Sequence, residues 1–109
     1  MRVTITGAAG FIGSHLAGSL LPDNEVVGLD NGRSGDWNRV PAGVIRHDLD
    51  VTEPDVEQWA DVLEGTEVLY HLAAEKYNSS KSSPEKVIAT NISAMATMLQ
   101  GAGRAGVRQ

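Results

Sequence analysis

Three glycines in a short loop are the first feature of this sequence that could do chemistry. Gly7, Gly10 and Gly13 follow a β-branched run that ends at Thr6, and they open an amphipathic stretch. In such a strand–turn–helix context the glycines allow a tight turn, a close approach of a pyrophosphate, and close packing of the helix. The helix N-terminus also offers N–H groups and partial positive charge to phosphates. The loop therefore predicts a dinucleotide phosphate site; the alternative is a turn needed only for packing.

An acidic residue ends the next predicted strand. Asp30 closes the run at 25–30, and a carboxylate at this strand end can accept hydrogen bonds from the adenosine ribose. The same charge would repel a 2′-phosphate, so the sequence favours NAD over NADP. Arg33 lies close behind and weakens this preference, because an Arg there can meet a 2′-phosphate. The alternative for Asp30 is an ordinary turn residue beside Asn31-Gly32.

Short apolar runs alternate along the chain with amphipathic ones. Strands are expected at residues 2–6, 25–30, 44–47 and 67–72, and helices at 11–21, from Thr52 to Gly65 and from Pro84 to Gly106. Thr52 and Ser83 are the expected N-caps of the last two helices. The expected inner stripes are Ile12, Leu16, Ser19 and Leu20 in the first helix, Val56, Trp59 and Leu63 in the second, and Ile88, Ile92, Met95, Leu99 and Ala102 in the third.

This alternation predicts an α/β fold of the Rossmann type. Parallel strands joined by right-handed crossovers follow from strand–helix alternation. The doubly wound arrangement places four such strands in the order 3-2-1-4, flanked by helices. The fourth strand then lies at an edge, and an exposed apolar edge is a liability that another strand or partner is expected to cover.

Composition excludes several classes of protein. The chain has 109 residues, enough for one domain. Its net charge of -5 and pI of about 5.0 argue against nucleic-acid binding and against electrostatic attachment to a membrane. It contains no cysteine, no apolar stretch of membrane-spanning length and no signal-peptide pattern. A soluble, cytoplasmic protein is expected.

A series of motifs in order resembles the extended short-chain dehydrogenase/reductase family, the NAD-dependent sugar-nucleotide epimerases and dehydratases. Residues 6–13 resemble the family's TGxxGxxG, and residues 30–35 resemble its DNLSSG loop. Asp48-Leu49 resembles the acidic-aliphatic pair after the third strand, 71–76 the HxAA segment, and Asn91 the Asn of the following helix. The resemblance implies cofactor contacts by Gly7, Gly10, Phe11, Ile12, Gly13, Asp30, Asn31, Arg33, Ser34, Asp48, Leu49, Leu72, Ala73, Ala74, Lys76 and Asn91.

The later motifs have alternative interpretations that the sequence leaves open. Ala73 and Ala74 leave room for a flat cofactor, or they are small core residues. Asp48 accepts from an adenine amino group, or it is a solvated or capping residue. Asn91 contacts the cofactor region, or it braces a loop backbone. Lys76 reaches a phosphate or ribose, or it is an ordinary surface lysine.

No catalytic residue is predicted within this chain. The resemblance covers about the first third of a family member, and it implies a catalytic Ser or Thr and a YxxxK pair beyond residue 109. A YxxxK does occur from Tyr77 to Lys81, but its Asn and Ser residues and the following Pro84 favour a loop, so we interpret it as a coincidence. His47, Asp48 and Asp50 project to different faces, so no metal site is expected.

The leading hypothesis is that residues 1–109 are the N-terminal part of an NAD(P)-binding Rossmann domain. The chain would be the cofactor-binding segment of an NAD-dependent epimerase, dehydratase or reductase, and as a fragment it would bind NAD weakly or not at all and could not catalyse. The nucleotide-sugar substrate would be bound only in a full-length form. A non-catalytic sensing or assembly protein of the same fold is the alternative. A third hypothesis is a structural fragment that forms a homodimer through the fourth strand.

Overall fold

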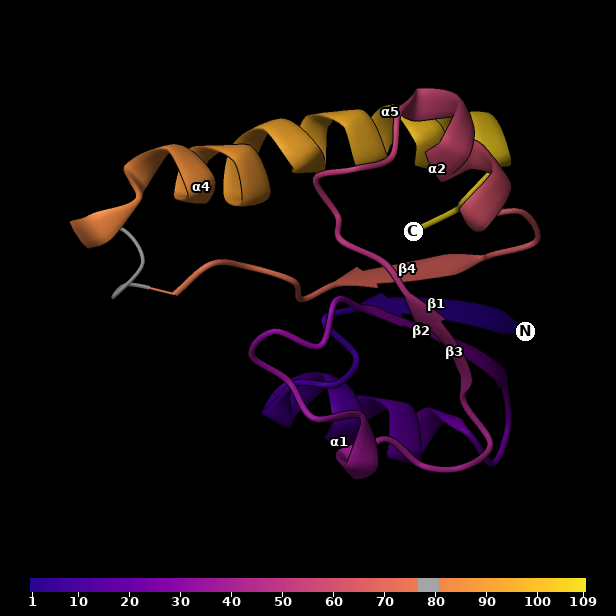
Figure 1. The fold of residues 1–109 in the computed structure, drawn as a ribbon. Helices are drawn as coiled ribbons and strands as arrows, with labels where there is room; N and C mark the ends of the chain where they lie inside the picture. The colour runs from indigo at the N-terminus through magenta and orange to yellow at the C-terminus, as the bar shows by residue number, and fades with distance from the viewer. Residues whose placement is uncertain (77–80) are drawn as a thin grey trace.

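A computed structural model describes residues 1–76 and 81–109 of the chain (Figure 1). Over these residues it contains one sheet of four parallel strands in the order β3-β2-β1-β4, which confirms the predicted topology. The strands are β1 (Arg2–Thr6), β2 (Glu25–Asp30), β3 (Ile45–Asp48) and β4 (Val68–His71). The first strand of the sequence is therefore central, and its Val3 pairs with Val26 on one side and Val68 on the other.

Helices cover both faces of this sheet (Figure 1). Helix α1 (Phe11–Leu20) covers one face, together with the short 3-10 turn η1 (Trp37–Arg39). The other face carries α2 (Val56–Val62) and a long helical run made of α4 (Pro84–Ile88), the π-helical turn η2 (Ala89–Ser93) and α5 (Ala94–Ala105). Gly106, at a φ of 78°, ends the run as a left-handed C-cap. None of the described helices is long and apolar enough to cross a membrane.

Two apolar cores follow from the alternation of side chains along the strands. Val3, Ile5 and Val26 pack toward α1, whereas Val27 and Leu29 pack toward α2 and α5. The second core is filled by Trp59, Leu63, Ala94, Met98 and Ala102. Because both faces of the strands are covered, β1 and β2 are buried almost throughout, as expected for a parallel sheet.

Helix α2 begins three residues later than the sequence suggested. Asp55, not Thr52, is its N-cap: the Asp55 carboxylate accepts from the Gln58 N–H at 2.8 Å, and the Gln58 side chain accepts from the Asp55 N–H at 2.9 Å. Such a reciprocal capping box satisfies two helix N–H groups at once. Thr52 instead bonds to Asp50 through its N–H and its hydroxyl. Ser83 does occupy the predicted N-cap position of α4, although its side chain makes no capping hydrogen bond.

The predicted inner stripe of the last helix is wrong. Ile88, Ile92, Met95 and Leu99 are 53%, 64%, 40% and 59% exposed, and only Ala102 of the predicted set is buried. The buried face is formed instead by Ala94, Met98, Gly101 and Ala102. At Gly101 an added Cβ would lie 2.3 Å from the Trp59 Cβ, so α5 approaches α2 through its smallest residues.

The inner face of α1 shows the same preference for small residues. Ile12 is 69% exposed and Ser19 is also exposed, contrary to the prediction, whereas Gly13, Ser14 and Ala17 are buried. Leu16 and Leu20 pack at the margin of the core. In both helices the close distance to the neighbouring element selects small side chains, and larger apolar ones are displaced outward.

The outer edge of β4 is partly occupied by the last residues of the chain. The Leu69 N–H donates to the Gln109 carbonyl at 2.8 Å, and the Arg108 N–H donates to the Glu67 carbonyl at 2.9 Å. Residues of the chain itself therefore cover part of this edge, as the sequence led us to expect. These bonds occupy backbone groups of Glu67 and Leu69 that a dimer formed through the fourth strand would use for pairing.

Candidate functional site

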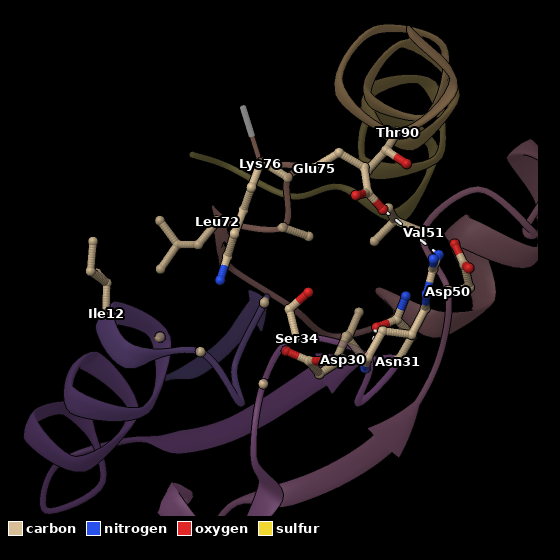
Figure 2. A pocket seen from close by; sticks show the side chains of 18 of the residues that line it. Ile12, Asp30, Asn31, Ser34, Asp50, Val51, Leu72, Glu75, Lys76 and Thr90 are labelled. Carbon is tan, nitrogen blue, oxygen red and sulfur yellow. Dashed lines mark hydrogen bonds and ion pairs between the residues drawn. The ribbon is translucent and has the colours of Figure 1, made fainter. Parts of the chain in front are cut away.

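A cleft of about 440 Å³ opens at the carboxyl ends of the strands (Figure 2). This is where ligands bind in open parallel sheets. Its walls come from the glycine loop, the loop after β2, the segment after β3 and the segment after β4. Of the predicted site residues, it is lined by Gly7, Gly10, Phe11, Ile12, Gly13, Asp30, Asn31, Arg33, Ser34, Leu49, Leu72, Ala73, Ala74 and Lys76.

The glycine loop has no room for side chains at its first and last glycines. Gly7 has a φ of 73°, and a Cβ there would lie 2.8 Å from the Ala73 nitrogen. A Cβ on Gly13 would lie 2.2 Å from the Gly7 carbonyl oxygen. The third glycine is therefore required because a side chain there would clash with the loop itself, and not because it would clash with the sheet. The Gly7 N–H donates to the Leu29 carbonyl at 2.8 Å, which fixes the loop to β2.

The N-terminus of α1 faces the cleft with its N–H groups available. Gly10 is the N-cap and has no side chain to accept from them, and the first turn carries no acidic residue. The first N–H groups of a helix have no partner within the helix. An anion in the cleft would therefore meet free donors and the positive end of the helix dipole.

Asp30 joins the two loops on one side of the cleft. Its carboxylate accepts from the Ala9 N–H at 3.0 Å and from the Gly32 N–H at 2.8 Å. Gly35 packs against Ala9, and the Asp36 N–H donates to the Ala9 carbonyl at 2.8 Å. Each carboxylate oxygen has a second lone pair, so Asp30 can hold the loop and still accept from a ligand hydroxyl.

Thr6 joins the glycine loop to the segment after β4. Its hydroxyl accepts from the N–H groups of Leu72 at 3.1 Å and Ala73 at 3.2 Å, and it lies 2.7 Å from the His71 Nδ1. With both lone pairs used, the hydroxyl donates its proton to His71, whose imidazole is then neutral. Burial lowers the pKa of His71, which favours the same neutral form.

Asn91 lies behind the cleft wall, and it does not line the cleft. From η2 its amide oxygen accepts from the Glu75 N–H at 2.9 Å, and its amide nitrogen donates to the Glu75 carbonyl at 3.3 Å. The geometry matches the interpretation of Asn91 as a brace for a loop backbone. A π-helical turn places this side chain, and such turns are frequent at functional sites.

Asp48 also does not line the cleft. Asp50, two residues further along, lines it instead. Asp48 is exposed and pairs in register with Asp30, whereas Leu49 faces the cleft and the second core. Adjacent side chains of an extended segment project to opposite faces, so one residue of the pair is directed away. A sequence signal for Asp50 was its spacing to Thr52, typical of an Asx turn.

The environment of Asp50 keeps it ionised. Partial burial would raise the pKa of Asp50, but hydrogen bonds from the N–H and hydroxyl of Thr52, the Asn31 side chain and the charge of Arg33 together lower it. The group is therefore a carboxylate acceptor at neutral pH. Within the described residues, no three His, Cys, Asp or Glu side chains gather in a way that would hold a metal ion.

Other cleft residues were not singled out by the sequence analysis. Val51, Glu75 and Thr90 are among them, and Glu75 forms an ion pair with Arg33 whose Nη1–Oε1 distance is 3.7 Å. Glu75 directly follows the two alanines of the HxAA segment. Its ion pair could not be predicted from that position, because its partner Arg33 is distant in sequence. Of the Tyr77-to-Lys81 segment, residues 77–80 lie outside the described part of the chain, so its interpretation as a coincidence stays a prediction.

Comparison with known proteins gives a consistent family. The model of the NAD dependent epimerase/dehydratase family matches residues 3–109. UDP-glucuronic acid decarboxylase 6 of Arabidopsis thaliana is 37% identical over 99% of this chain and 32% of its own length. The chain thus spans about a third of the curated relatives that it matches.

Solved structures show the same relationship. The UDP-glucose 4-epimerase of Thermotoga maritima, solved with UDP-glucose, superposes with a TM-score of 0.90 at 27% identity, over 98% of this chain and 35% of that one. That of Thermus thermophilus, solved with NAD, superposes with a TM-score of 0.86 at 32% identity over the same shares. The matched residues 3–109 include all of the family motifs found in the sequence. The chain therefore belongs to the NAD-dependent epimerase/dehydratase family.

Proposed function

We propose that this chain is the NAD-binding portion of an oxidoreductase that acts on a sugar nucleotide. The observation that supports it most is the meeting of two features in one cleft. The uncapped N-terminus of α1 provides donors for a pyrophosphate, and Asp30 provides acceptors for a ribose on the adjacent strand. The NAD bound in the related Thermus thermophilus structure is in keeping with this assignment.

In this proposal the dinucleotide lies across the strand ends. The pyrophosphate meets the backbone between Gly10 and Gly13, and the adenosine ribose meets Asp30. The adenine lies toward Leu49 and Asp50, with Asp50 in the acceptor role that the sequence suggested for Asp48. The nicotinamide half runs along the small side chains of Ala73 and Ala74, with Leu72 and Lys76 at its border; the proposed contacts also include Phe11, Ile12, Asn31, Arg33 and Ser34.

We propose NAD in preference to NADP because the Asp30 carboxylate lies at the end of β2, where the adenosine ribose is proposed to bind. Asp50 and Glu75 also line the cleft, as do the cations Arg33, Arg39 and Lys76. An additional phosphate on the ribose would be repelled by the Asp30 carboxylate at short range. The dinucleotide without that phosphate avoids this cost.

The complete activity is proposed for a longer protein. Residues 1–109 would be the N-terminal part of its NAD(P)-binding domain, and the nucleotide-sugar site and the catalytic Ser or Thr and YxxxK residues would lie further along that protein. We also propose that it acts in the cytoplasm as a homodimer. A parent reading frame without those residues would favour the alternative, a non-catalytic protein that uses the dinucleotide for sensing or assembly.

Calorimetric titration of the chain with NAD tests the proposal. Gly10 has an extended backbone conformation (φ −77°, ψ 175°) that any residue adopts, and an added Cβ would lie 3.3 Å from the Gly7 carbonyl oxygen, a tight contact that a small shift of the loop must relieve. The Gly10→Val side chain should obstruct the phosphate position and abolish saturable binding by the parent, and circular dichroism of the variant checks that its fold is kept. Gly103→Val is the matched control, because an added Cβ there meets nothing within 4 Å. A parent chain that is folded by circular dichroism and does not bind NAD would contradict the proposal.

A further inference from the structure

One ion pair crosses the cleft between its two walls. The Arg33 Nη1 lies 3.7 Å from the Glu75 Oε1, and both residues line the cleft. Arg33 belongs to the loop after β2 and Glu75 to the segment after β4, the two strands that flank β1. Figure 2 shows the Glu75 carboxylate directed toward the side of the cleft that carries Asn31 and Asp50, with the ion pair dashed.

The acidic partner is held in place independently of its side chain. Both backbone polar groups of Glu75 bond to the Asn91 amide. The Glu75 side chain is 20% exposed, against 55% for Arg33, so the carboxylate is the more buried partner. A substitution that keeps the shape of Glu75 and removes only its charge leaves the Asn91 brace intact.

Arg33 follows Asp30 closely and, like Arg39, lines the cleft, but the charge of Arg33 is already engaged. Glu75 pairs with it directly, and Arg33 also contributes to the lowered pKa of Asp50. Asp30, the last residue of β2, lies three residues before Arg33. A second anion must compete with these carboxylates for one guanidinium.

From this geometry we infer that Glu75 is a specificity-determining residue that selects NAD by holding Arg33 away from a 2′-phosphate. The inference rests on the proposed function and deepens it. The selectivity comes from a contact across the cleft in addition to the repulsion by Asp30. It also explains how an Arg can follow Asp30 closely without converting the site to NADP.

The test is the ratio of the dissociation constants for NADP and NAD, measured by calorimetry for Glu75→Gln. Release of a partly exposed ion pair should lower this ratio by about fivefold. Arg33→Ala should remove that gain in the Glu75→Gln background, and it should change the ratio less in the parent. The two substitutions are thus expected to be non-additive. The gain should shrink as salt is raised, because the interaction is between charges near the surface.

Glu57→Gln is the matched control. Glu57 also forms an ion pair, with Arg104 at 3.9 Å, but on α2 and away from the cleft, so the same loss of charge should leave the ratio unchanged. An unchanged ratio in Glu75→Gln, or an equal drop in Glu57→Gln, overturns the inference while NAD binding by the parent stands. A gain that survives Arg33→Ala also overturns it. Failure of the parent to bind NAD overturns the proposed function and the inference together.

Discussion

At the scale of single residues, the shape of the cleft depends on polar side chains that form hydrogen bonds with backbone groups of neighbouring segments. The Thr6 hydroxyl holds the N–H groups of Leu72 and Ala73, Asp30 holds the N–H of Ala9, and Asn91 holds Glu75. Each bond joins two segments that line the cleft or support it. Polar side chains used in this way position the backbone donors, so removing one of them disturbs the shape of the cleft as well as a contact.

The Thr6–His71 pair leads to a pH dependence of stability. Burial lowers the pKa of folded His71 below its ordinary value of 6.5. Below about pH 6.5, His71 is therefore protonated in the unfolded chain but remains neutral in the folded chain. The free energy of unfolding falls as the pH falls toward the folded-state pKa of His71. His71→Gln keeps an acceptor for the Thr6 hydroxyl but cannot titrate, so urea unfolding should show a shallower decline in this range. The same slope in parent and variant would contradict the neutral imidazole.

At the scale of elements, the start of α2 is fixed by its capping box. Asp55→Ala removes the acceptor for the Gln58 N–H and should destabilise the protein by about 1 kcal/mol in urea unfolding. Asp61→Ala removes the same charge from the far end of the helix, where an acid opposes the helix dipole, and should cost nothing or stabilise slightly. Equal losses in the two variants would mean that net charge, and not the cap, determines the effect.

The elements also show how far the sequence could lead. The strand order was predictable because strand–helix alternation admits few topologies. The positions of the glycine loop and Asp30 were predictable because their signals are local: three glycines after a β-branched run, and an acid at a strand end. The contact between Arg33 and Glu75 was not, because it depends on where two distant loops meet.

The inner face of α5 was missed for a related reason. Large apolar residues and small ones both recur at helical spacing in this helix, and periodicity alone does not say which stripe is inside. The close approach of Gly101 to Trp59 decides it, and that approach is a property of the packed pair of helices.

At the scale of the whole molecule, the stripe displaced outward is an apolar surface. Ile88, Ile92, Met95 and Leu99 are exposed along one helical run, and such patches mark contact sites. We expect the proposed homodimer to form there, so a double variant with Ile92→Ser and Leu99→Ser should have the lower mass in sedimentation. Gln100→Ser, next to the stripe and also exposed, should behave as the parent. A parent that is monomeric at the same concentration would contradict this expectation.

The central position of β1 has a consequence for synthesis on the ribosome. The strand leaves the exit tunnel before β4, yet its pairing with Val68 and the Thr6 bonds to Leu72 and Ala73 require residues that are translated later. Until then one edge of β1 is unpaired and the glycine loop lacks its second wall. We therefore expect the nascent chain to be open to wrong pairing during this interval. The proposed cofactor site would be completed only when β4 arrives, so we do not expect a cofactor to act as a template for the earlier part of the fold.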